Sequence, residues 1–171
     1  MDKIGIILFA RYSSSRLKGK VLKKFNDKTL LDCIMVRLLR SAGKIPIVVA
    51  TSNTESDQKI VEHCIQNKYV YFRGSLKNVI KRTKDCCSFF NFKAFIRICC
   101  DRPFIDYTQM EKMISEFLKS DFDIVTNTFP RTFPKGLTIE IAKTNCFDKI
   151  KKKKIVYSDF EHIFNYFYRN N

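Results

Sequence analysis

The sequence predicts an α/β fold: a three-layer, doubly wound and mostly parallel sheet with a small antiparallel hairpin extension. Two observations carry this prediction. Short apolar runs, typical of strands buried on both faces, alternate five times with segments of helical apolar spacing within the first 126 residues. Because parallel strands need crossover connections and helices usually supply them, this alternation indicates a doubly wound sheet.

The expected strands are the apolar runs themselves. The first, residues 4–10, is apolar on both faces, which is the pattern of a parallel strand inside a sheet. The other expected strands follow in chain order at residues 45–51, 69–72, 94–99 and 122–126.

Four helices are expected between these strands, because apolar residues recur there three and four positions apart. The first helix starts near Thr29, and Gly43 is expected to end it. The other three are marked by the apolar residues of 60–65, 79–87 and 110–117.

The alternation ends after residue 126. Pro130 and Pro134 bracket a stiff segment, and residues 137–142 alternate as an antiparallel strand does. Residues 151–154 form a basic run, which we interpret as a solvated helix end or loop.

Composition favours one folded cytoplasmic domain over residues 1–171. A chain of 171 residues with 45% hydrophobic side chains hides roughly 70% of its unfolded surface, which excludes general disorder. The longest apolar runs, residues 4–10 and 45–50, are far shorter than the roughly 20 residues of a membrane span. The N-terminus shows no signal-peptide cleavage pattern.

The net charge is +15, from 32 Lys and Arg against 17 Asp and Glu. Such an excess favours polyanionic partners: nucleic acid, acidic lipid or a phosphate-rich small molecule. A general bias of composition toward lysine would also raise it. Nucleic acid is the less favoured partner, because no RNA- or DNA-binding motif occurs and the aromatic residues follow helix and strand patterns.

The seven cysteines are odd in number, include two adjacent pairs and show no C-x-x-C spacing. We therefore expect reduced thiols of a cytosolic protein that behave as small buried hydrophobes. A zinc site at His63 and Cys64 would lack a second pair of ligands.

The expected ligand site lies beyond the carboxyl ends of the strands, as in other open α/β sheets. Four polar segments follow expected strands and should meet there. They are residues 11–20, 51–53, 73–78 and 101–106.

The first of these segments has the composition of a phosphate-binding loop. It reads Ala10-Arg-Tyr-Ser-Ser-Ser-Arg-Leu-Lys-Gly-Lys20, with three serines, two arginines, two lysines and a glycine. Arginine and lysine suit phosphate oxygens, and hydroxyls and backbone N–H groups complete such a cradle. The loop is neither a Walker A motif nor a Rossmann G-x-G-x-x-G. A solvated basic loop is the alternative.

The spacing Ala-Arg-x-x-Ser-x-Arg-Leu-x-Gly-Lys at residues 10–20 resembles that of cytidylyltransferases of the spore-coat-polysaccharide type. These are relatives of the CMP-acidic-sugar synthetases, which include the acylneuraminate and 3-deoxy-manno-octulosonate cytidylyltransferases. Further segments match in order over nearly the whole chain, at residues 48–52, 72–79, 97–106, 127–140 and 161–163.

This resemblance implies the nucleotide-diphospho-sugar transferase (Rossmann-like) fold and a homodimer. It also implies transfer of CMP from CTP to an acidic sugar or related acceptor, with release of pyrophosphate, in surface polysaccharide or glycan biosynthesis. An acceptor oxygen would attack the α-phosphorus in line, so catalysis would consist of positioning and charge neutralisation.

The resemblance also implies roles for individual residues. The implied nucleotide-binding residues are Ala10, Arg11, Ser13, Ser15, Arg16, Lys20, Ala50, Thr51, Ser52, Arg73, Gly74, Ser75 and Arg97. The implied catalytic residues are Arg11, Arg16, Lys20 and Asp101. Asp101 matches the family's Mg²⁺ ligand, and Mg²⁺ prefers one or two carboxylates plus substrate phosphates. From the residues alone, Asp101 would equally cap a turn, and Asp106 is the expected N-cap of the next helix.

The implied acceptor-binding residues are Arg131, Lys135, Glu140, Glu161 and His162. Two alternatives stay open at these positions. Arg131 and Lys135 would also suit an exposed hairpin, and His162 would also suit the edge of an apolar helical face over residues 160–167.

The chain departs from the family's pattern at Lys18, Asn78, Cys100 and Thr138, where Pro, Asp, Gly and an acidic residue are usual. We also expect residues 1–171 to form a single nucleotidyltransferase domain that is C-terminally short for the family. A relative that binds nucleotide without turnover is therefore the second hypothesis, and a basic nucleic-acid binder is the third.

Overall fold

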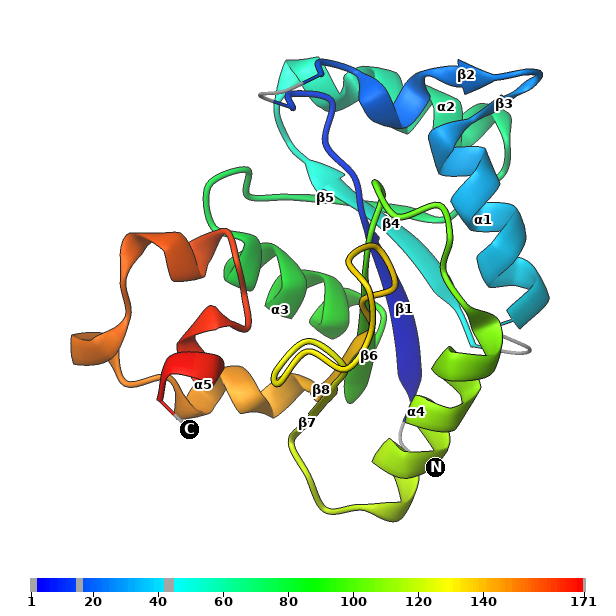
Figure 1. Ribbon diagram of the computed structural model, residues 1–171. Helices are drawn as coiled ribbons and strands as arrows, with labels where there is room; N and C mark the ends of the chain where they lie inside the picture. Colours follow the sequence, from blue (N-terminus) through cyan, green and yellow to red (C-terminus); the bar gives the residue numbers. More distant parts are fainter. Residues whose placement is uncertain (1–2, 15–16, 42–44, 171) are drawn as a thin grey trace.

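The computed structural model describes residues 3–14, 17–41 and 45–170 and is built around one six-stranded sheet (Figure 1). The strand order is β5-β4-β1-β6-β8-β7. The bounds are β1 (Ile4–Phe9), β4 (Ile47–Ser52), β5 (Tyr71–Gly74), β6 (Ala94–Cys99), β7 (Ile124–Thr126) and β8 (Glu140–Lys143). A separate two-stranded antiparallel hairpin consists of β2 (Lys24–Phe25) and β3 (Lys28–Thr29).

Within the described residues, five α-helices connect or follow these strands. They are α1 (Leu30–Ser41), α2 (Gln58–Gln66), α3 (Val79–Phe89), α4 (Tyr107–Lys119) and α5 (Asn165–Arg169). Short 3-10 helices cover Lys20–Leu22, Glu55–Asp57, Thr144–Lys149, Lys152–Lys154 and Tyr157–Phe160. Within the described ranges, no helix has the length and apolar character needed to cross a bilayer.

The sheet is mostly parallel, as predicted. Strands β5, β4, β1 and β6 pair in parallel, whereas β8 pairs antiparallel with both β6 and β7. The predicted antiparallel strand at 137–142 is therefore β8, and it belongs to the main sheet. The small separate hairpin is β2–β3, before the first helix.

The predicted strands and helices are all present, and most of their ends are shifted by a few residues. Residues 94–99 match β6 in full, and Asp106 caps α4 by accepting a hydrogen bond from the Gln109 backbone N–H at 2.9 Å. The strand expected at 69–72 is β5, which begins two residues later, because Lys68 adopts a positive φ of 56° in the turn that leaves α2. Gly43, the expected end of the first helix, lies outside the described residues.

Helices lie on both sides of the sheet (Figure 1), and two apolar layers cover its faces. Successive residues of β1 point to opposite faces, so that Ile6 joins one layer and Ile7 the other. The first layer includes apolar residues of α1, α2 and α4, such as Leu38 and Met110. The second includes apolar residues of α3 and of residues 144–170, which we call the C-terminal segment. Phe95 of β6 stacks with Phe147 and Phe164 of this segment. This is the predicted three-layer arrangement.

The cysteines pack as small apolar side chains. All seven are free thiols, and five are buried: Cys64, Cys86, Cys87, Cys100 and Cys146. Burial raises the pKa of Cys64, Cys86 and Cys146 to about 12, so these thiols remain protonated at neutral pH.

Candidate functional site

A cavity of about 320 Å³ opens where β1 and β6 end. Its walls come from the loop after β1, the loop after β6, helix α3 and the C-terminal segment. The lining residues are Phe9, Ala10, Arg11, Ser14, Lys20, Val21, Val79, Arg82, Arg97, Cys99, Cys100, Asp101, Arg102, Glu161 and His162. Two of the four polar segments expected at this edge, 11–20 and 101–106, therefore meet in one cavity.

The loop after β1 folds back on itself. The Gly19 backbone N–H donates to the Tyr12 carbonyl at 2.8 Å, and Gly19 has a φ of 70°, in the left-handed region that favours glycine. A Cβ on Gly19 would lie 2.9 Å from the Tyr12 ring. The turn delivers Lys20 and Ser14 to the cavity, whereas Ser13 is exposed outside it. Ser15 and Arg16, both expected site residues, lie outside the described residues.

Asp57 links this loop to the end of β4 through hydrogen bonds. Asp57 was not among the site residues expected from the sequence. Its buried carboxylate accepts hydrogen bonds from the backbone N–H of Tyr12 at 2.7 Å and of Ser52 at 2.9 Å. It also accepts one from Thr51 Oγ1 at 2.9 Å. Thr51 and Ser52 are fully buried and do not line the cavity. The Thr51 hydroxyl serves this support, whereas the Ser52 hydroxyl lies 2.6 Å from the Thr54 hydroxyl.

The expected contacts at Arg73, Gly74 and Ser75 also lie outside the cavity wall. Arg73 donates to the carbonyls of Ser52 and Thr54 and to Gln58 Oε1, and so braces the turn between β4 and α2.

Ser75 and Asn78 together start helix α3. Ser75 Oγ accepts from the Asn78 N–H at 3.0 Å, and the Asn78 side chain accepts from the Lys81 N–H at 2.8 Å. Asn78, one of the departures from the family pattern, thus serves as a normal N-cap.

Lys20 and Asp101 form an ion pair of 2.8 Å in the cavity. Burial raises the pKa of Asp101, but the hydrogen bond and charge of Lys20, helped by Arg102, outweigh this effect and hold the pKa below its usual value. Asp101 is therefore ionised at neutral pH. Capping of α4 falls to Asp106, which leaves Asp101 free of that task.

A second ion pair joins the two ends of the chain at the cavity. Arg11 Nη2 lies 2.8 Å from Glu161 Oε1, and both residues line the cavity together with His162. Arg131 and Lys135, the other expected acceptor-binding cations, are exposed and lie outside the cavity lining.

Glu140, an expected acceptor-binding residue, is buried and does not line the cavity. It is 3% exposed, pairs with Arg97 and accepts a hydrogen bond from the Tyr168 hydroxyl at 2.7 Å. Burial lowers the pKa of Arg97, but the neighbouring Cys99 together with the charge and hydrogen bond of Glu140 outweighs it and holds that pKa above its usual value. The carboxylate is therefore the counter-ion of Arg97, which does line the cavity.

Arg82 is a charged cavity residue that lies outside the segments that the sequence singled out for the site. It lies on α3, is 4% exposed, and has its guanidinium 5.6 Å from the centre of the Phe9 ring. Its Nε and Nη1 atoms have no hydrogen-bond partner among the described residues. The available signal was a charged residue within a segment whose apolar residues, such as Val79 and Cys86, face the core.

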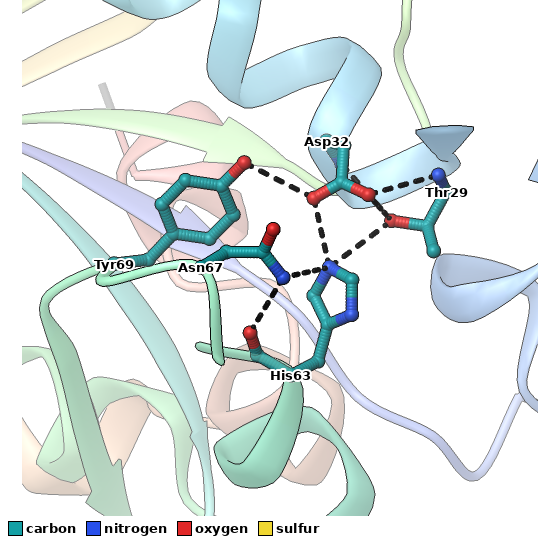
Figure 2. Close-up of polar contacts among 5 residues, drawn as sticks. All are labelled: Thr29, Asp32, His63, Asn67 and Tyr69. Atoms are coloured by element: carbon teal, nitrogen blue, oxygen red, sulfur yellow. Dashed lines mark hydrogen bonds and ion pairs between the residues drawn. The ribbon is translucent and has the colours of Figure 1, made fainter. Parts of the chain in front are cut away.

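A polar cluster elsewhere in the molecule links α1 to α2 (Figure 2). His63 Nε2 lies 2.8 Å from Asp32 Oδ1 and 3.3 Å from Thr29 Oγ1, and the Tyr69 hydroxyl donates to Asp32 at 3.1 Å. Asn67 Nδ2 contacts the same ring nitrogen at 3.3 Å. The ring contacts of His63 described above all go to Nε2, whereas the histidine of a catalytic triad uses both ring nitrogens. We therefore interpret this cluster as a structural link between α1 and α2.

A larger cavity of about 470 Å³ lies between β7 and α5 and is lined mainly by aromatic residues and lysines. No residue of the two ion pairs lines it. We assign the candidate site to the smaller cavity, because the carboxyl ends of β1 and β6 open into it.

The family model described as Cytidylyltransferase matches residues 4–170 of this chain. The chain belongs to the cytidylyltransferase family. The family consists of nucleotidyltransferase enzymes, which agrees with the resemblance found in the sequence.

Among relatives of this cytidylyltransferase, an uncharacterized protein of Methanocaldococcus jannaschii is 34% identical over 170 residues, covering 99% of the chain and 68% of the relative. The spore coat polysaccharide biosynthesis protein SpsF of Bacillus subtilis is 29% identical over 177 residues, covering the whole chain and 72% of the relative.

Solved structures show the same fold as this cytidylyltransferase. A cytidylyltransferase from Leptospira borgpetersenii is 32% identical with a TM-score of 0.92, covering 99% of this chain and 72% of that one. A CMP:2-keto-3-deoxy-manno-octonic acid synthetase solved with CTP has a TM-score of 0.66 at 17% identity, covering 88% of this chain and 79% of that one. The expected Rossmann-like nucleotidyltransferase fold is confirmed.

Proposed function

We propose that this cytidylyltransferase transfers CMP from CTP to an acidic sugar or related acceptor and releases pyrophosphate, as a step of surface polysaccharide or glycan biosynthesis. The carrying observation is the charge of the cavity. Among the described residues, five cations line it, namely Arg11, Lys20, Arg82, Arg97 and Arg102, against the carboxylates of Asp101 and Glu161. A polyanionic substrate is the chemistry that such a cavity binds.

The loop after β1 binds the triphosphate in this proposal. Arg11 offers a guanidinium fork and Lys20 a point charge, and both lie on the turn that Gly19 and Asp57 hold in place. Because residues 11–14 and 17–20 of the loop are already folded, binding costs little ordering of this part of the backbone. Arg16 and Ser15 remain predicted members of the same loop.

Asp101 fits a divalent cation such as Mg²⁺. It is ionised and lines the cavity. Among the described residues, no group of three or more His, Cys, Asp or Glu side chains could hold a metal ion by itself, so substrate oxygens would have to complete the ligand set. One carboxylate plus substrate phosphates is the ligand set that Mg²⁺ commonly takes. When bound, the ion supplies charge neutralisation at the phosphates.

The chain's own residues then position the reaction. An acceptor oxygen forms a bond to the α-phosphorus as the bond to the leaving pyrophosphate breaks. Arg11 and Lys20 stabilise the negative charge that develops on the phosphate oxygens. His162 and Glu161 line the acceptor side, where the imidazole orients the acceptor hydroxyl and takes up its proton.

Arg131 and Lys135 are exposed and lie outside the cavity lining, and they remain predicted acceptor-binding residues. A homodimer is also part of the proposal. Sedimentation measures this assembly. A monomer at micromolar concentration would exclude it.

Pyrophosphate release tests the proposed function. We expect release with CTP, Mg²⁺ and at least one member of a panel of acidic sugars, and much less with ATP, GTP or UTP. If CTP binds but no acceptor gives pyrophosphate, the chain is a binder without turnover. If RNA binds with steep salt dependence and CTP does not compete, the basic nucleic-acid hypothesis replaces this one.

A further inference from the structure

The wall of the cavity contains a buried arginine whose charge no acidic side chain compensates directly. Arg82 is 4% exposed, and its Nε and Nη1 have no hydrogen-bond partner among the described residues. The other buried charged residues differ in this respect. Asp57, Glu140 and Asp159 each accept hydrogen bonds or pair with an arginine.

Burial without a partner is costly for a charged group. It lowers the pKa of Arg82 to about 10, so the guanidinium still carries its proton at neutral pH. The charge of Asp57 raises the pKa of Arg82, but the Asp57 carboxylate already accepts hydrogen bonds from Tyr12, Thr51 and Ser52. Arg82 is therefore a retained positive charge with unused donors.

The position of Arg82 is tightly defined. Its Cγ lies 2.7 Å from the point where a Cβ on Gly74 would be, so the stem occupies space that only a glycine leaves open. Its guanidinium faces the Phe9 ring at 5.6 Å, and Arg97 faces the same ring at 6.0 Å. A donor group held in this way is organised before a ligand arrives.

A second positive group points toward the same region. Arg11 lowers the pKa of Arg82 through its charge, so the two guanidiniums repel each other in the absence of a ligand. Both line the cavity. An anion between them would relieve this repulsion and satisfy the unused donors of Arg82.

We propose that Arg82 is a binding residue for an anionic oxygen of the substrate in this cavity. The proposal rests on the proposed function and extends it to a residue of α3. Two substrate groups carry this chemistry: a phosphate of the nucleotide, or the acid group of the acceptor. A guanidinium bonded to either gives a charge-assisted hydrogen bond.

The test compares Arg82→Met with Lys81→Met. The first substitution keeps the aliphatic stem beside Gly74 and removes the charge. The second removes a charge from an exposed neighbour that pairs with Asp85 and lies outside the cavity. Binding of CTP, inorganic pyrophosphate and cytidine is measured by calorimetry, and melting of each free protein is measured alongside.

We expect Arg82→Met to melt at or above the temperature of the unsubstituted protein, because an uncompensated buried charge is gone. If the target is a phosphate, the variant binds CTP and pyrophosphate about 10- to 100-fold more weakly and binds cytidine normally. If the target is the acceptor's acid group, those ligands are unaffected and binding of 3-deoxy-manno-octulosonate or N-acetylneuraminate weakens instead. Arg82→Lys should recover part of either loss, and Lys81→Met should show none.

Three results would overturn the inference: unchanged binding of every ligand, an equal loss for cytidine and CTP, or a melting temperature lowered by several degrees. Equal loss would indicate contact with the neutral base, and lowered melting would indicate a structural residue. Pyrophosphate and free sugar acids report anion binding without turnover. The proposed function can therefore fail while this inference stands, and a wild-type enzyme that turns over with an unaffected Arg82→Met variant would remove this inference alone.

Discussion

The ion pair between Arg11 and Glu161 predicts that Glu161→Gln binds CTP more tightly than the unsubstituted protein. In the free protein Glu161 holds the guanidinium that the proposed triphosphate contact needs, at 2.8 Å. The triphosphate must displace this carboxylate, and the carboxylate also adds negative charge to the cavity. Glutamine keeps the shape of the side chain and removes both effects.

The size of the effect follows from exposure. The two side chains are 46% and 48% exposed, so solvent screens their attraction. Exposed pairs are worth about 0.2–1 kcal/mol, which corresponds to an affinity gain of about 1.5- to 5-fold. Because the attraction is screened, the gain should shrink when ionic strength rises from about 0.05 M to about 0.5 M.

The assay is calorimetric titration with CTP at low and high salt, without acceptor, so that any role of Glu161 toward the acceptor does not enter. Glu111→Gln is the matched control, since it removes the same charge from an exposed position on α4 outside the cavity. Equal or weaker CTP binding by Glu161→Gln at low salt would refute the reasoning. An equal gain in both variants would show that only net charge matters.

Three further predictions concern single residues. Asp101→Asn should lower the rate of pyrophosphate release by about 100-fold or more while the protein stays folded; an unchanged rate would remove Asp101 from the metal site. Gly19→Ala should cost at least about 1 kcal/mol of stability in urea unfolding and weaken CTP binding, because Gly19 has a φ of 70° and the Tyr12 ring leaves no room for a Cβ; unaltered stability and binding would contradict the loop geometry. Asp32→Asn should lower stability at pH 7 by about 1–3 kcal/mol. Burial raises the pKa of Asp32, but hydrogen bonds from Thr29 and His63 lower it by a larger amount, so the pKa of Asp32 is lower in the folded than in the unfolded protein. This stability is present above the unfolded pKa and is lost as pH falls through the folded pKa, so the two proteins should converge in acid; a constant difference down to about pH 2 would count against the assignment.

The fold followed from the sequence because its physical causes are local. A strand buried on both faces must be apolar throughout, and a crossover helix needs one apolar stripe, so both appear as patterns along the chain. The start of β5 was harder to predict from the sequence, because the turn at Lys68 depends on a backbone conformation that no hydrophobic pattern encodes. The pairing of β8 within the main sheet required contacts between residues far apart in sequence.

The candidate site was predictable only where strand ends determine it. Residues 11–20 and 101–106 meet as expected, because β1 and β6 are neighbours in the sheet. Whether a polar side chain in a loop faces the cavity or the interior depends on its partners. Asp57 draws Thr51 inward, and Arg97 with Tyr168 draws Glu140 inward.

The last stretch of the chain holds the cavity at two points. Glu161 is bonded to Arg11, and Tyr168 of α5 is bonded to Glu140, which in turn is bonded to Arg97. A displacement of this stretch would therefore release the Arg11 guanidinium and remove one hydrogen bond from the Glu140 carboxylate, which would stay paired with Arg97. The C-terminal segment thus contributes one polar contact to Arg11 and another to the counter-ion of Arg97, while its apolar residues, such as Phe164, belong to the layer beside α3.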